Sequence, residues 1–293
     1  MNAKRAVCST FVVAMLALMM LGGCSGNSSF RTKDGAYEFE DSVRMDSLLK
    51  AEDTLALDEL TEEAPLPMSV DELFDDFIFS FDQSNRLQRA RVEFPLMVIE
   101  ADGSVRTIEH NDWHHHYVFL QQDFCTAFWD SPSQMRLPQD TTITHARLEH
   151  IFLHSRQVDA YIFNRDTMNG QWFLSEERIS SFEHSPLASF FDFYQRFATD
   201  SIYQQQHLAQ TLRFRTADEE NDYEIIEGTI DADQWTEFAP ELPEDVLVCI
   251  NYGQSYNNPK QMLMQLRGIS NGLQNLLRFQ RDNGEWRLTE FEN

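Results

Sequence analysis

The chain has 293 residues, enough for about two domains at roughly 100–200 residues each. Hydrophobic residues make up 42% of it, including 23 Phe, so most of the chain is expected to fold around an apolar core. Its 48 acidic residues outnumber its 23 basic ones, and the formal net charge of −25 repels nucleic acid and anionic lipid headgroups. Nucleic acid is therefore excluded as a partner.

The first 23 residues have the pattern of a secretory signal. Lys4 and Arg5 precede an apolar run over 7–21, which is shorter than the roughly 20 apolar residues of a membrane span. The run ends in Leu-Gly-Gly-Cys24, which resembles the lipobox of bacterial lipoproteins. The resemblance implies that Cys24 carries lipid and anchors the protein in the cell envelope. We expect the outer membrane, with the protein facing the periplasm or the cell surface.

Residues 24–68 are predicted to form an acidic, flexible tether. Acidic residues outnumber basic ones here, so the segment repels itself and extends, and Pro65 and Pro67 lie at its end. A short partner-binding helix over 48–60 is the alternative.

The remaining chain contains an internal repeat with an offset of about 116 residues. Four apolar residues with helical spacing occur in 74–81 and again in 190–197, so each set lies on one helix face. Both copies end in a hairpin pattern that contains an Asn-Gly pair before a Trp, at Trp172 and at Trp286. Trp113 and Trp235 are a further matching pair. These landmarks occur in the same order and predict two domains, 69–180 and 185–293.

Each copy is predicted to place helices before strands. The first helix is expected to start at the capping box Ser69-x-x-Glu72 and the second at Ser185-Pro186, with short helices after Ser84 and Asp200. Alternating residues then predict strands at 93–100, 104–109, 145–154, 157–165 and 171–178, and at 212–217, 223–230, 246–252, 261–269, 272–281 and 285–291. This order is typical of α+β folds.

The Phe-rich helix, the run over 88–96 and the hairpins at Trp172 and Trp286 resemble a family of bacterial lipoproteins. Its domains are nuclear-transport-factor-2-like (NTF2-like), or cystatin-like, rolls. The resemblance implies an α+β fold with two tandem rolls, each with N-terminal helices packed on a bent antiparallel sheet that leaves a conical pocket. Because this fold hosts many activities, it implies no particular chemistry.

Histidines and cysteines are the first candidates for chemistry. A metal site formed by His150 and His154 with His114 or His116 is conceivable, but an ordinary loop cluster is the interpretation we prefer, and no metal is assigned. Cys125 and Cys249 follow Trp113 and Trp235 at similar distances, which suggests buried, free thiols in two separate cores.

No catalytic residue is assigned from the sequence. It contains no nucleophile elbow, no phosphate-binding glycine loop and no paired Cys-x-x-Cys, so no cofactor is predicted either. If one roll were an enzyme, Asp123 and His150 would be the candidates for its pocket.

A loop over 252–258 is the predicted ligand-binding segment. It is polar, aromatic and glycine-bearing, it occurs only in the second copy, and we expect it to be accessible and to border a concave surface. The predicted binding residues are Tyr252, Gln254, Tyr256 and Asn257.

Two functions follow as hypotheses. The first is a non-enzymatic cell-envelope lipoprotein that binds an unidentified small ligand or envelope protein. The alternative is an enzyme of the hydrolase or isomerase type that uses one conical pocket. A pocket that holds an ionisable side chain with a shifted pKa beside a second polar group would favour the enzyme.

Overall fold

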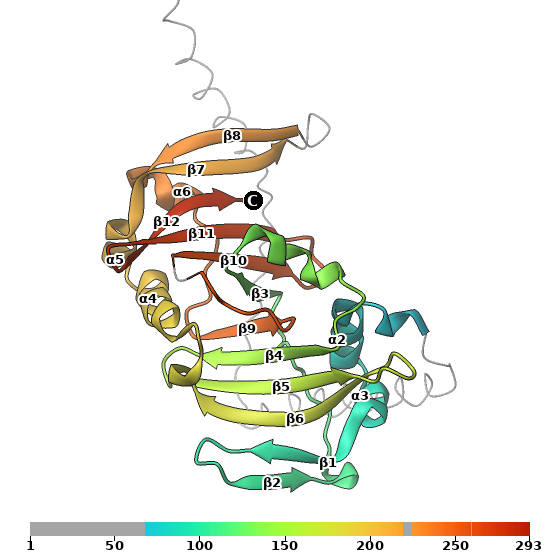
Figure 1. The fold of residues 1–293 in the computed structure, drawn as a ribbon. Coiled ribbons are helices and arrows are strands. Elements are labelled where there is room, and N and C mark those ends of the chain that lie inside the picture. Colours follow the sequence, from blue (N-terminus) through green and yellow to red (C-terminus); the bar gives the residue numbers. More distant parts are fainter. Residues whose placement is uncertain (1–67, 219–223, 259) are drawn as a thin grey trace, which may run out of the picture. The chain divides into compact units, whose positions relative to one another are not determined.

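The computed structural model describes residues 68–218, 224–258 and 260–293 (Figure 1). The predicted signal, Cys24 and nearly all of the predicted tether lie outside these residues. The described part belongs to one of the two compact units of the chain, residues 58–293. None of the helices in this part is long and apolar enough to cross a membrane.

The first half of the described chain has helices before strands, as predicted. Its elements are η1 (Met68–Asp71), α2 (Phe74–Gln83), α3 (Asn85–Arg91), β1 (Val92–Ile99), β2 (Val105–Ile108), η2 (His110–Asp112), β3 (Phe124–Trp129), η3 (Pro132–Gln139), β4 (His145–Phe152), β5 (Gln157–Arg165) and β6 (Trp172–Ser181). Helix α2 begins at Phe74 and not at the predicted box, because Leu73 has an extended backbone, with φ −112° and ψ 145°, that separates α2 from η1. The predicted start of α3 is confirmed, since the Ser84 side chain accepts from the backbone N–H of Leu87.

The second half repeats the order. Its elements are η4 (Phe182–His184), α4 (Ala188–Thr199), α5 (Ser201–Gln206), β7 (Leu208–Asp218), β8 (Glu224–Asp231), η5 (Ala232–Gln234), α6 (Trp235–Phe238), β9 (Val246–Asn251), β10 (Gln261–Gly268), β11 (Gln274–Asp282) and β12 (Glu285–Glu292). Every predicted strand is present, whereas β3 was not predicted.

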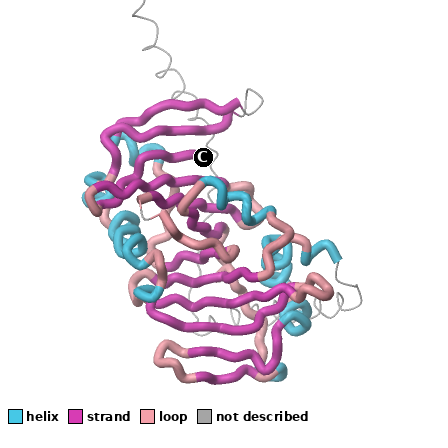
Figure 2. The backbone as a smooth tube through the Cα atoms, viewed as in Figure 1, coloured by secondary structure: helices cyan, strands magenta, loops and turns pink. Residues whose placement is uncertain are grey.

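The twelve strands form one mixed sheet, and the prediction of two separate sheets is wrong. The order is β2-β1-β6-β5-β4-β9-β3-β10-β11-β12-β7-β8. Figures 1 and 2 show this succession, with β9 and β3 in the middle. From each end of the sheet toward its middle, the strands of the two halves follow in the same order, β2-β1-β6-β5-β4 from one end and β8-β7-β12-β11-β10 from the other. The innermost strand of each series comes from the other half, since β9 follows β4 and β3 follows β10. Strand β3 pairs antiparallel with β10, β9 pairs antiparallel with β4, and the two central strands are parallel.

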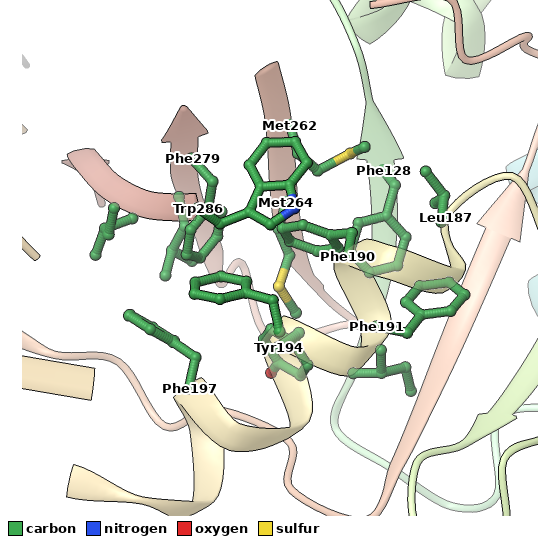
Figure 3. Packing of buried hydrophobic residues seen from close by; sticks show 14 of the residues in the cluster. Phe128, Leu187, Phe190, Phe191, Tyr194, Phe197, Met262, Met264, Phe279 and Trp286 are labelled. Atoms are coloured by element: carbon green, nitrogen blue, oxygen red, sulfur yellow. The ribbon is translucent and has the colours of Figure 1, made fainter. Parts of the chain in front are cut away.

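Two apolar cores lie on opposite faces of this sheet, because neighbouring side chains of a strand point to opposite faces. One core contains the Phe stripe of α2 and the other contains that of α4. The central strands contribute to both, so that Phe128 faces α4 while Trp129 faces the α2 core. In the second core Phe190 lies 5.7 Å from Phe128 and 5.3 Å from Trp286, between ring centroids (Figure 3).

A glutamine–tryptophan contact occurs in both halves. Gln88 donates to the carbonyl of Phe81 at 2.8 Å and accepts from the indole of Trp113 at 3.3 Å. In the second half Gln204 donates to the carbonyl of Phe197 at 2.9 Å and accepts from Trp235 at 3.0 Å. Each contact fixes the short second helix against a distant segment of its own half.

A buried polar cluster joins the two halves. Arg267 of β10 pairs with Asp75 of α2, and their side chains are 13% and 14% exposed. The Tyr252 hydroxyl donates to Asp75 at 2.5 Å and accepts from Arg267 at 2.5 Å. The three side chains satisfy one another away from water, so the contact fixes α2 against a strand of the other half.

Candidate functional site

The structure places the side chain of Tyr252 in the α2 core, whereas Gln254, Tyr256 and Asn257 of the predicted binding loop are not buried there. Tyr252 is 2% exposed, stacks on Trp129 at 5.7 Å between ring centroids and bonds to Asp75, so the expectation that it is accessible is wrong. Gln254 and Tyr256 are partly buried and Asn257 is exposed.

The loop is held in place by polar contacts with β3 and the residue that follows it. Gln254 donates to the carbonyl of Phe128 at 3.0 Å and to the Tyr256 hydroxyl at 3.1 Å. Asp130 accepts from the backbone N–H groups of Asn257 and Asn258 at 2.5 and 2.9 Å. The position of Tyr256 therefore depends on β3, which pairs with β10 of the second half.

Tyr256 lies between two adjoining cavities. The larger has a volume of about 480 Å³ and the smaller about 350 Å³, and Pro186, Leu187 and Tyr256 line both. Asn257 lines the smaller one together with Arg281 and Trp286. The loop thus borders a concave surface, as predicted, through Tyr256 and Asn257.

The larger cavity combines an apolar wall with polar groups. Its apolar surface comes from Val158, Ala160 and Ile162 of β5 and from the start of α4, and its polar groups come from β4, β6 and the end of β9. Such a mixture, in a cavity of several hundred Å³, is typical of small-molecule sites. The arrangement follows from the fold, since the segment between β6 and α4 passes over this face of the sheet.

Arg147 and Glu149 are the charged pair of this cavity. Both are on β4, two residues apart and so on the same face, and their nearest charged atoms are 3.4 Å apart. Burial raises the pKa of Glu149, and Arg147 opposes the shift. Burial likewise raises the pKa of Tyr256. Sequence reasoning missed this pair, although two charged residues at alternate positions of a predicted strand could have indicated it.

The predicted histidine cluster is only partly assembled. The ring of His116 lies 6.4 Å from that of His150 and its Nε2 is 3.2 Å from the Tyr161 hydroxyl, whereas His154 contacts Asp245. Burial lowers the pKa of His150 to about 4. The described residues contain no group of three or more His, Cys, Asp or Glu that could hold a metal ion.

The two thiols are free and buried, as predicted. They lie on the neighbouring strands β3 and β9, where Thr126 is paired with Cys249. They nevertheless face different cores, because the side chains of Cys125 and Cys249 point to opposite faces of the sheet. Burial raises the pKa of Cys125 to about 12, which keeps it a thiol at neutral pH.

A third cavity, of about 660 Å³, lies at the start of β3 and beside the segment that leads into β9. Asp123, one of the two residues considered for an enzyme pocket, lines it. His150, the other, donates from Nε2 to the carbonyl of Val118 at 2.7 Å, and Val118 belongs to the α2 core. The structure therefore does not bring these two residues together.

Comparisons with known proteins identify relatives of the chain. The model of a family described as a domain of unknown function (DUF4348) matches residues 52–293. A crystal structure of an NTF2-like protein (BF2862) from Bacteroides fragilis NCTC 9343 is 38% identical in sequence, with a TM-score of 0.71. The alignment covers 78% of this chain and 98% of that one. A comparison with curated proteins found no match.

Proposed function

Because the chain belongs to the DUF4348 family, we propose that it is a non-enzymatic lipoprotein of the cell envelope that binds a ligand or protein partner beside Tyr256. One observation supports this most directly: Tyr256 separates two cavities that combine apolar walls with hydrogen-bonding groups. The Leu-Gly-Gly-Cys24 sequence supports an anchor through lipid on Cys24, in the outer membrane.

The proposal includes two tandem cystatin-like rolls that have exchanged one strand. The repeated strand order, the two Phe stripes and the two glutamine–tryptophan contacts support this origin. The helices of the two rolls lie on opposite faces of the shared sheet. The binding cavity then belongs to both rolls, since β4, β5 and β6 supply its floor while the β9–β10 loop supplies Tyr256.

The test removes the side chain that separates the cavities. Envelopes are solubilised, the lipidated protein is captured, and bound proteins and small molecules are identified by mass spectrometry. Replacing Tyr256→Ala and Gln254→Ala together is expected to abolish a specific bound species. Tyr117→Ala, which removes a tyrosine that is 41% exposed, is the matched control and is expected to retain it. Identical binding by the double variant and the wild type would remove the proposal.

The anchor is tested separately. Cys24→Ser is expected to leave the protein unprocessed or released from membranes, because two or three acyl chains hold a protein far more firmly than none. Mass spectrometry of the wild-type N-terminal peptide should show an acylated Cys24. An unacylated N-terminus at another residue contradicts the anchor and leaves the binding cavity unaffected.

A hydrolase or isomerase is the second candidate, and one observation favours it. Glu149 lines a cavity beside Arg147 and Tyr256 and its pKa is raised by burial, and a carboxyl group with a raised pKa in a cavity is a candidate for proton transfer. A hydrolysis screen with ester and glycoside substrates should detect turnover that Glu149→Gln abolishes while the Tm is retained. Turnover that survives in this variant excludes the mechanism.

A further inference from the structure

We infer that the smaller of the two cavities beside Tyr256 binds a linear aliphatic carboxylate, with the carboxylate group at Arg281. This assignment rests on the proposed function, since Tyr256 lines the cavity, and it names the chemical class of the ligand. The cavity has a volume of about 350 Å³, within the range of small-molecule sites. Arg281 is the one charged side chain among its described lining residues, in a chain where 48 acidic residues face 23 basic ones.

Two arginines occupy the same place in the two halves but have different partners. Arg165 at the end of β5 and Arg281 at the end of β11 lie over the ring of the Trp that follows the turn, at 5.9 and 5.7 Å from the ring centroid. Each donates from Nε to a glycine carbonyl of its own turn, at 2.8 and 3.1 Å. Arg165 also donates from Nη1 to the carbonyl of Thr141 at 2.5 Å. Within the described chain the two Nη atoms of Arg281 have no hydrogen-bond or ion-pair partner, so their N–H groups are free to bind a ligand.

The difference follows from the lengths of two connecting segments. Residues 130–144 join β3 to β4 and supply the Thr141 carbonyl. They also place three apolar side chains against the α2 core, Met135, Leu137 and Ile143. The corresponding segment of the second half, residues 252–260 between β9 and β10, is shorter. It contributes Tyr256 to the edge of the α4 core, and the cavity lies between this segment and that core.

Apolar side chains form the inner wall of the cavity. Leu187, Phe190 and Met262 belong to the α4 core and line the cavity, and they lie beside Trp286 (Figure 3). The longer segment of the first half supplies an oxygen atom to the arginine and apolar groups to the core. A ligand that takes the corresponding place in the second half therefore needs an oxygen acceptor and an apolar chain.

The buried indole beside Arg281 adds a donor to the site. The Nε1 atom of Trp286 is buried and has no hydrogen-bond partner in the described part of the chain. The same holds for Trp172, so the feature specific to the second half is the unpartnered guanidinium group. A carboxylate accepts two parallel hydrogen bonds from a guanidinium group, and methylene groups are favourably buried against apolar side chains. These two requirements together select an aliphatic carboxylate.

Isothermal titration with octanoate and with 1-octanol tests the inference. Octanoate is expected to bind saturably, and Arg281→Met should raise its Kd roughly tenfold, because the variant removes charge-assisted hydrogen bonds and keeps an apolar side chain. The Kd of 1-octanol, which has the same chain without the charge, should change less than about twofold. Butanoate should bind the wild type more than about tenfold more weakly than octanoate, because it buries four fewer methylene groups.

The matched control is Arg165→Met, which removes the same charge from the same place in the first half. Its guanidinium group already has the Thr141 carbonyl, so the Kd of octanoate should change less than about twofold. Titrations are carried out well below the Tm of both variants. Equal weakening by the two variants, or the absence of saturable octanoate binding, overturns the inference.

A second variant tests the position of the chain. Ser189 is exposed and lines the cavity, so Ser189→Trp places a large side chain at its mouth and should abolish binding of both octanoate and 1-octanol. Octanoate binding that survives in this variant also overturns the inference.

The outcome is distinguishable from that of the capture experiment. If Tyr256→Ala with Gln254→Ala abolishes capture but Arg281→Met leaves octanoate binding unchanged, the proposed function stands and the carboxylate site is wrong. If that double variant retains every captured species while Arg281→Met weakens octanoate binding, the cavity binds an aliphatic carboxylate and the proposed function is wrong.

Discussion

Arg267 and Asp75 show how much one buried contact between the halves contributes. Replacing Arg267→Met leaves the largely buried Asp75 carboxylate with Tyr252 but without its counter-ion, and we expect the free energy of unfolding to fall by up to about 3 kcal/mol. Urea unfolding measures the loss. The exposed pair Arg106–Glu100, with side chains 51% and 32% exposed, is the control, and Arg106→Met should cost less than about 1 kcal/mol. Equal costs would show that the buried pair is not a link between the halves.

His150 and Glu177 predict opposite pH dependences. The pKa of His150 falls to about 4 on folding, so the unfolded state binds more protons between about pH 6.5 and 4 and His150 lowers stability as the pH falls through this range. The pKa of Glu177 rises to about 7 because of burial, so the folded state binds more protons above about pH 4.5 and Glu177 lowers stability as the pH rises towards 7.

The two effects partly cancel in the wild type and are separated by substitution. Relative to wild type, His150→Gln should lose stability less on acidification from pH 6.5 to 4. Glu177→Gln should lose stability less as the pH rises from 4.5 to 7. Urea midpoints across pH 4–8 test both, and parallel curves for the two variants and the wild type would contradict the assigned environments.

At the scale of elements, the β11–β12 hairpin has a turn that depends on glycine. Asn283 and Gly284 have φ of +49° and +89°, the left-handed pair that a two-residue hairpin turn needs. Gly284→Ala should therefore cost about 1 kcal/mol, measured by urea unfolding. Gly228→Ala in β8 is the matched control, since its φ lies outside the left-handed region and a Cβ there meets no atom within 4 Å. A similar cost at both positions would show that the loss of stability in Gly284→Ala does not come from its left-handed backbone.

Most elements could be predicted from the sequence, and β3 shows why one could not. Alternation reveals strands with one face in a core, such as β4 and β11, because their polar residues mark the other face. Strand β3 is buried from Cys125 to Trp129 on both faces, so it has no alternation. The pairings of β3 with β10 and of β9 with β4 could not be predicted either, since alternation indicates the face that a residue occupies and says nothing about the strand with which it pairs.

The candidate site was predictable only where its residues are local. The Tyr256 loop was found because its composition differs from that of a strand. Tyr252 was misplaced because its partners, Asp75 and Arg267, are remote in the sequence. The Arg147–Glu149 pair is local to β4, but the cavity that it lines is formed by segments that only the tertiary structure brings together.

At the scale of the whole molecule, the shared sheet predicts one cooperative unfolding unit. Phe77→Ala creates a cavity in the α2 core and should cost about 3–5 kcal/mol. Because the two cores share β3 and β9, amides of β11 in the other half should lose hydrogen-exchange protection by the same free energy. In the reciprocal experiment, Phe193→Ala creates a cavity in the α4 core, and hydrogen-exchange protection is measured at the amides of β5. Unchanged protection of β11 in Phe77→Ala would show that the halves unfold independently.

The pairing of β3 with β10 also delays completion of the fold during synthesis. The indole of Trp129 donates to Gln265, which follows it by 136 residues. At roughly 5–20 residues per second, on the order of 10 s pass between the appearance of these two residues at the ribosome. Throughout this interval β3 is an apolar strand whose partner β10 has not yet been made. A nascent chain in this state is able to pair β3 with β10 of a neighbouring finished copy, so a high local rate of synthesis is expected to favour interlocked oligomers.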